Sequence, residues 1–152
     1  MPIWGWRMIE RVLFSVLALV ILPAAAQADA WSAFKARCLD PFEIQSPPVV
    51  AGLSGAVLAN GDEAYALPEG REMRVENAPP DGNLACAVID PSGAAATGFQ
   101  EWIAAAVAEE RYHAVQPGLW RSDTWIEPVL AIEERIINGT RILRIVETQL
   151  ES

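Results

Sequence analysis

The single histidine of this chain, His113, is the side chain best suited to proton transfer near neutral pH. It follows a predicted helix and stands next to Arg111 and Tyr112. At that position a positive charge near the helix C-terminus would already be favourable. General acid–base catalysis would require a partner group close to it, and the sequence alone does not locate one. Convergence of His113 with Asp123 or Glu127 in the fold would favour an enzyme.

A segment from residue 119 to residue 127 combines two tryptophans with charged side chains. Trp120 and Trp125 are five residues apart, so on a strand they point to opposite faces and at most one of them lines the core. An exposed tryptophan beside an arginine is typical of binding hot spots. Trp120, Arg121 and Trp125 are therefore the predicted binding residues. The alternatives are that both tryptophans are buried, or that one of them covers the sheet edge.

The only two cysteines, Cys38 and Cys86, are predicted to form a disulfide, because an even cysteine count in a chain with a predicted signal peptide favours pairing. The bond would close a loop of roughly 49 residues and contribute about 4 kcal/mol at most in the chain-entropy model. Structural zinc needs four nitrogen or sulfur ligands, and one histidine cannot complete such a set. Free buried thiols and a reactive pair remain alternatives, although the short spacing of redox pairs is absent.

Other motifs give little support to a particular chemistry. Ser54 lies in a Gly-Leu-Ser-Gly segment that resembles a nucleophile elbow, but the second glycine is misplaced and no strand leads into it. The glycines match neither the dinucleotide nor the phosphate-loop pattern, and no calcium-loop spacing occurs.

Carboxylate pairs such as Glu133–Glu134 are expected on a solvated surface, although two carboxylates across a cleft could still serve a glycosidase. We predict no metal site and no cofactor.

The first 28 residues have the three-part layout of a secretory signal peptide. Arg7 and Arg11 supply positive charge, an apolar run over residues 12–22 follows, and Ala26-Gln27-Ala28 provides a small-x-small cleavage site. The apolar stretch is shorter than the roughly 18 residues of a membrane-spanning helix. We expect cleavage after Ala28, or alternatively after Ala26. The protein is then periplasmic or extracellular, with membrane contact only through this segment before cleavage.

The expected mature chain, residues 29–152, is long enough for a single domain with a core and too short for two. The chain has a net charge of −9, which becomes −10 when Arg7, Arg11 and Glu10 are removed. Such a surface repels nucleic acid and anionic lipid, because phosphates need positive charge opposite them. An unknown protein or small-molecule partner is expected instead, and the charge favours one that is neutral or basic.

The first half of this domain is predicted to hold one helix and three strands. The helix begins behind the cap Asp29, and Asp40-Pro41 is expected to end it, because a residue before proline avoids helical geometry. A face formed by Trp31, Phe34 and Cys38 would dock on the sheet through the disulfide. Turns rich in proline and glycine separate the strands, which are expected at 63–67, 72–76 and 83–89. The third strand is apolar on both faces, which predicts a central position.

The second half is predicted to hold another helix and three further strands. A capping box over Thr97-Gly98-Phe99-Gln100 begins the helix. The strands are expected at 120–126, 129–137 and 141–149, with Asn138-Gly139 as a two-residue hairpin turn between the last two. That turn sets Ile132 opposite Ile145. It also sets Glu133 opposite Arg144 on the face expected to be exposed to solvent.

These patterns predict an α+β domain with an antiparallel sheet and two helices, in the order helix, three strands, helix, three strands, with one disulfide. The leading functional prediction is an exported, non-enzymatic binding or interaction protein of unknown ligand. The alternative is a small extracytoplasmic hydrolase that uses carboxylates or His113. A purely structural envelope component is a third possibility.

Overall fold

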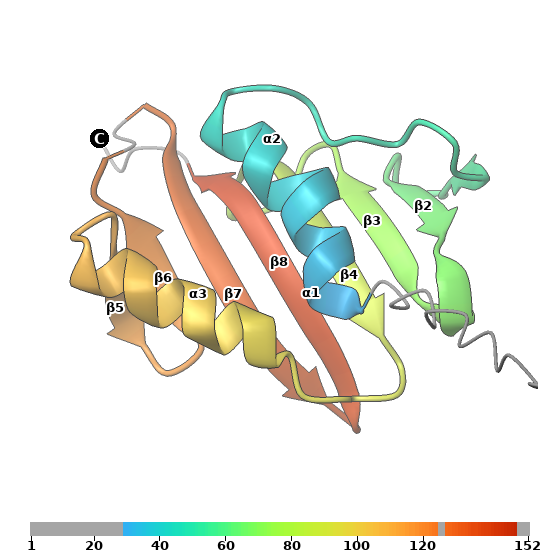
Figure 1. Ribbon diagram of the computed structural model, residues 1–152. Helices are drawn as coiled ribbons and strands as arrows, with labels where there is room; N and C mark the ends of the chain where they lie inside the picture. Colours follow the sequence, from blue (N-terminus) through green and yellow to red (C-terminus); the bar gives the residue numbers. More distant parts are fainter. Residues whose placement is uncertain (1–28, 125–126, 149–152) are drawn as a thin grey trace, which may run out of the picture.

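The computed structural model describes residues 29–124 and 127–148, so the predicted signal peptide and Trp125 lie outside the described residues. It has two layers, an antiparallel sheet and a set of helices that cover one of its faces (Figure 1). The strand order in the sheet is β1-β2-β3-β4-β8-β7-β6-β5. The strands are β1 (Gly55–Val57), β2 (Glu63–Ala66), β3 (Glu72–Glu76), β4 (Gly82–Asp90), β5 (Tyr112–Gln116), β6 (Leu119–Ser122), β7 (Val129–Ile137) and β8 (Thr140–Thr148). The predicted α+β class with an antiparallel sheet is therefore confirmed.

The first helical segment runs through α1 (Ala30–Phe34), the π-helical turn η1 (Lys35–Leu39) and α2 (Asp40–Glu43) without a break. Asp29 caps its start, accepting the Ser32 N–H at 2.7 Å. The predicted end at Asp40-Pro41 is wrong, because Asp40 keeps helical dihedral angles. Pro41 has no N–H to donate to the Arg37 carbonyl four residues earlier, and that carbonyl accepts the Val49 N–H at 2.9 Å instead.

The second helix, α3 (Thr97–Ala108), begins one residue earlier than its predicted cap implied. Ala96 is the N-cap residue and makes no side-chain capping bond, so the predicted capping box is wrong. The Gln100 side chain instead donates a hydrogen bond to Glu134 on β7. The apolar face of α3 meets the sheet through Phe99, Ile103 and Ala106, which are buried, whereas Val107 is 38% exposed.

A disulfide joins the helical layer to the middle of the sheet. Cys38 in η1 and Cys86 in β4 are bonded with their Cα atoms 5.4 Å apart, and both residues are fully buried. Phe34 and Val88 belong to the same buried cluster, so the bond lies inside the core between the layers. The predicted pairing and its docking of the helix onto β4 are confirmed. No helix within residues 29–124 or 127–148 has the length and apolar character to cross a membrane.

The sheet contains two strands beyond the predicted six. β1 lies before the first predicted strand, and β5 follows α3 directly, so each helical segment is followed by four strands. The predicted register of the last hairpin is confirmed, with Ile132 opposite Ile145 and Glu133 opposite Arg144. The expected exposure of that charged pair is wrong, because Glu133 and Arg144 are 8% and 9% exposed.

Candidate functional site

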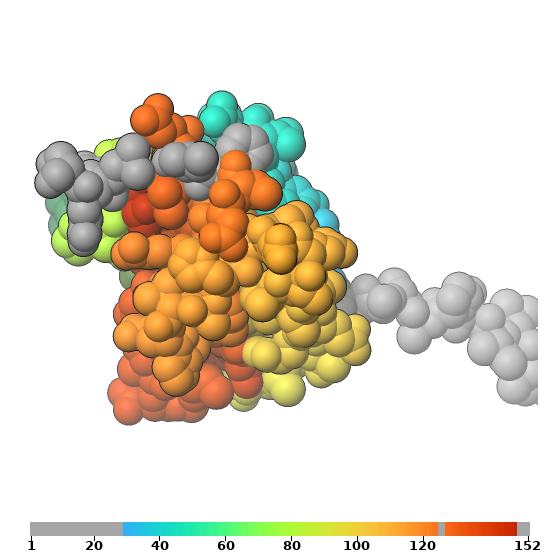
Figure 2. Space-filling view, turned by 90° about the vertical axis from the view of Figure 1, so that its left-hand side faces the viewer, coloured from blue at the N-terminus to red at the C-terminus, as the bar shows by residue number. Residues whose placement is uncertain are grey.

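The β5–β6 hairpin forms one edge of the sheet and presents His113 and Arg121 on the face that carries no helices. The two residues are direct cross-strand partners. Tyr112 is buried in the core on the helical side, so alternation along β5 turns His113 to the other face. Figure 2 looks at this edge, with the hairpin in front of the two layers. Asp123, just after β6, places its Oδ1 atom 2.7 Å from His113 Nδ1.

The His113–Asp123 pair has the geometry of the histidine–carboxylate part of a hydrolytic site. A proton on Nδ1 would be donated to Asp123 and would leave Nε2 able to accept another proton. Both side chains are accessible, with exposed fractions of 54% and 42%. Ser122 is adjacent in sequence but is buried, and its Oγ accepts the Leu130 N–H at 2.9 Å. It points to the helical side, so it is not the nucleophile of this pair.

The structure separates two of the three predicted binding residues. Trp120 is partly buried on the helical side, where its ring meets Phe99 edge to face with centroids 5.6 Å apart. Arg121 is exposed on the opposite side of the sheet. Trp125 lies outside the described residues. Arg121 therefore shares its surface with His113 and Asp123 rather than with Trp120.

Among the described residues, Arg121 also makes no ion pair. Within the described ranges, every basic side chain except Arg37 and Arg121 makes an ion pair with a carboxylate. The paired residues are Lys35, Arg71, Arg74, Arg111, Arg135, Arg141 and Arg144. In a chain with nearly twice as many acidic as basic residues, an arginine without a carboxylate partner is available to an anionic group from outside.

A second polar cluster lies further along the same face of the sheet, in a depression of about 400 Å³. Arg144 donates to Glu76 and Asp81 at 2.7–2.9 Å, which is a bidentate arrangement with each carboxylate. Glu133 Oε2 lies 2.5 Å from an Arg135 nitrogen and 3.5 Å from an Arg144 nitrogen. Each charge of this cluster has an oppositely charged neighbour within it, although Glu133 Oε2 is buried and accepts no hydrogen bond. Arg144 is therefore occupied by carboxylates of the chain and does not offer a free anion site.

The electrostatics of this cluster follow from those contacts. Hydrogen bonds from Arg144 lower the pKa of Asp81 below its ordinary value, and they outweigh the opposite effect of burial. Burial alone would lower the pKa of Arg144, but its bonds to Asp81 and Glu76 raise it, so the guanidinium stays charged. The sequence indicated only the Glu133–Arg144 pairing. Glu76 and Asp81 come from another part of the chain, and no local pattern links them to Arg144.

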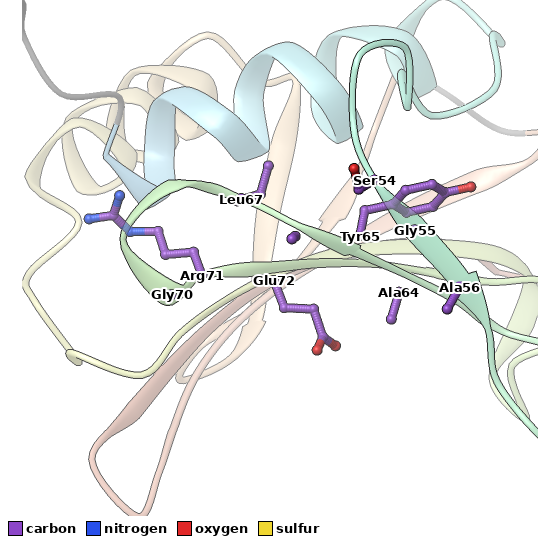
Figure 3. Close-up of a pocket in the computed structure, with 10 residues that line it drawn as sticks. Ser54, Gly55, Ala56, Ala64, Tyr65, Leu67, Gly70, Arg71 and Glu72 are labelled. Carbon is purple, nitrogen blue, oxygen red and sulfur yellow. The ribbon is translucent and has the colours of Figure 1, made fainter.

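A shallow hollow of about 480 Å³ at the opposite edge is lined by β1, β2 and β3 (Figure 3). Figure 3 shows the Tyr65 ring lying beside Gly55. A Cβ at Gly55 would stand 2.3 Å from that ring, so only glycine allows this approach. Ser54 leads into the three-residue edge strand β1 rather than into a helix, which excludes the nucleophile elbow.

Within residues 29–124 and 127–148, no three His, Cys, Asp or Glu side chains are grouped so as to hold a metal ion. No family model, no curated protein and no solved structure matches this chain. The functional argument therefore rests on the geometry of the chain itself.

Proposed function

We propose that this protein is an exported, non-enzymatic binding protein that contacts its partner through the outward face of the β5–β6 hairpin. The observation that carries the proposal is the exposed guanidinium of Arg121, which makes no ion pair among the described residues. Export is supported by the predicted signal peptide, and the Cys38–Cys86 bond is consistent with an oxidising compartment.

The side chains next to Arg121 could contact a protein surface or a small polar ligand. His113 and Asp123 add a donor, an acceptor and an aromatic ring within the same two strands. The edge strand itself is a poor template for an added strand, because its register shifts between Ala114 and Gln116. The partner is therefore expected to meet side chains on the face of the hairpin rather than extend the sheet.

The net charge of the chain and the charge of Arg121 further restrict the class of partner that could bind. The strongly acidic chain slows association with any highly acidic molecule. Arg121 nevertheless offers one local site for a carboxylate or phosphate. The best match is a neutral or basic partner that carries a single anionic group, and nucleic acid with its repeated phosphates is a poor match.

The test is an affinity comparison between the unmodified protein and the Arg121→Gln variant, with partners captured from the envelope fraction. Loss of a central arginine contact is expected to weaken binding by about thirtyfold. Arg135→Gln is the matched control, because Arg135 lies on the same face but pairs with Glu133. Equal loss in the two variants, or no loss in Arg121→Gln, would rule out Arg121 as the anchor.

A small hydrolase is the second candidate, and the 2.7 Å contact between His113 and Asp123 specifically favours it. A histidine held in this way could act as a general base toward water. If it does, His113→Ala should lower ester or glycoside hydrolysis by about a hundredfold or more. Hydrolysis that is undetectable in the unmodified protein, or unchanged in His113→Ala, leaves binding as the function of this surface.

A further inference from the structure

A crevice lies on the helical side of the molecule, far along the sheet from the β5–β6 hairpin. It has a volume of about 470 Å³, which falls in the range of small-molecule sites. One wall is the outward side of α1 and η1, and the other is formed by the loop before β1 and by the β2–β3 connection with its short helix η2 (Pro68–Gly70). The lining residues are Ser32, Ala33, Ala36, Arg37, Leu53, Leu67, Pro68 and Arg71.

The inner part of this crevice is apolar. Leu67 is 8% exposed, and it points from the β2–β3 connection toward the helices (Figure 3). Ala33 and Leu53 are partly buried and pack against the main core. Ala36 and Ser32 lie at the exposed rim. A ligand in the crevice would therefore meet apolar surface inside and water only at its rim.

Arg37 is the charged feature of the crevice that is not neutralised. Its Nη1 atom donates to the carbonyl oxygens of Val49 and Ala51 at 2.9 and 3.3 Å. In the part of the chain that the structure describes, it makes no ion pair, and its Nε and Nη2 atoms have no hydrogen-bond partner. Those two nitrogens form the side of the guanidinium that binds a carboxylate through two parallel bonds. The other arginine of the crevice, Arg71, is already paired with Glu69 and Asp90.

We propose that this crevice binds a small amphipathic carboxylate, whose apolar chain packs on Ala33, Leu53 and Leu67 and whose carboxylate pairs with Arg37. The anchoring of Nη1 holds the guanidinium in place before the ligand arrives, which reduces the entropy lost on binding. The site is separate from the Arg121 surface and does not depend on the function proposed for it.

The first experiment uses the purified protein with decanoate and with decanol, a probe that has the same chain and no charge. Calorimetric titration should give tighter binding of decanoate by about tenfold to a hundredfold, the usual difference for a hydrogen-bonded charge. Arg37→Gln should remove that difference by weakening decanoate alone. Arg74→Gln, which changes an arginine that pairs with Glu72 away from the crevice, should leave both probes unaffected.

Arg37→Gln could weaken decanoate binding by loosening the loop at Val49 and Ala51 that Arg37 holds. Two further measurements test the crevice without changing Arg37. Ala36→Trp fills the mouth of the crevice from an exposed position, and it should abolish binding of both probes while the protein stays folded. In the unmodified protein, decanoate should shift the backbone NMR signals of residues 32–37 and 67–71. Equal affinity for the two probes, no binding of either, or shifts confined to other residues would overturn the proposal.

Discussion

Asp90 is 2% exposed, yet it carries a negative charge at the end of β4. It accepts hydrogen bonds from the Ser92 N–H and hydroxyl at 3.0 and 2.7 Å, and from Arg71 Nε at 3.1 Å. Burial alone would raise the pKa of Asp90, but these bonds outweigh it and hold the pKa below its ordinary value. The residue is therefore a charged part of the structure that depends on its partners.

Replacing this carboxylate should be costly. Asp90→Asn should lower the free energy of unfolding by about 3 kcal/mol, because it breaks a buried ion pair from one side. Urea unfolding at neutral pH measures the change. Glu69→Gln is the control, since Glu69 pairs with the same arginine from a position that is 38% exposed. Its cost should stay below about 1 kcal/mol, and equal costs would contradict the assignment of Asp90 as the principal partner.

The Asp90 carboxylate should also affect how the free energy of unfolding changes at acidic pH. Its folded pKa lies below the unfolded value of about 3.9, so its contribution is complete above that pH and is lost as the pH falls through the folded pKa. Unfolding free energies measured below about pH 4 should therefore fall more steeply in the unmodified protein than in Asp90→Asn. Parallel pH profiles would show that Asp90 does not contribute in this way.

At the residue scale the sequence predicted part of the candidate site. Arg121 was one of the three predicted binding residues; its side chain is exposed, and its role in binding stays a prediction. Asp123 and Glu127 were named as possible partners of His113, but the sequence could not show that Asp123 pairs with it, because the contact depends on β5 folding back on β6. The lack of an ion pair at Arg37 among the described residues could not be predicted either, since it depends on which carboxylates the fold brings near each arginine.

At the scale of elements, the β7–β8 hairpin shows how local chemistry sets register. Asn138 and Gly139 both have positive φ angles, +52° and +78°, as a type I′ turn requires. That turn and the alternation of side chains were sufficient to predict the pairing of β7 with β8. β1 and β5 were not predicted. β1 is an edge strand of three residues, all of them exposed, and the pairing of β5 with β6 shifts register between Ala114 and Gln116. Neither strand has the alternating pattern that marks a half-buried strand.

Substitution in this turn should test its conformation. Gly139→Val should lower the free energy of unfolding by about 2 kcal/mol, because a β-branched residue is strained at positive φ. Thermal or urea unfolding provides the measurement. Asn138→Gly, which keeps the same backbone freedom, should change stability by less than about 0.5 kcal/mol. If the two variants were equally stable, the hairpin would have to turn in another way.

At the scale of the whole molecule, the Cys38–Cys86 bond ties the helical layer to the central strand of the sheet across 48 residues of sequence. Reduction should lower the free energy of unfolding by roughly 2–4 kcal/mol, mainly by releasing the unfolded chain. Urea unfolding with and without reductant gives this difference. The Cys38→Ala/Cys86→Ala double variant should not respond to reductant, and an equal response would place the effect elsewhere.

The central claim is that the outward face of the β5–β6 hairpin meets a partner, and site-specific photo-crosslinking tests it most directly. A photoreactive phenylalanine analogue at Gln116, an exposed residue opposite Leu119 on this hairpin, should form a covalent adduct with the partner in the envelope. Arg121→Gln should remove that adduct. The same probe at Val57, which is 73% exposed on the far edge strand β1, should form none. An adduct from Val57 alone, or one from Gln116 that persists in Arg121→Gln, would contradict the account.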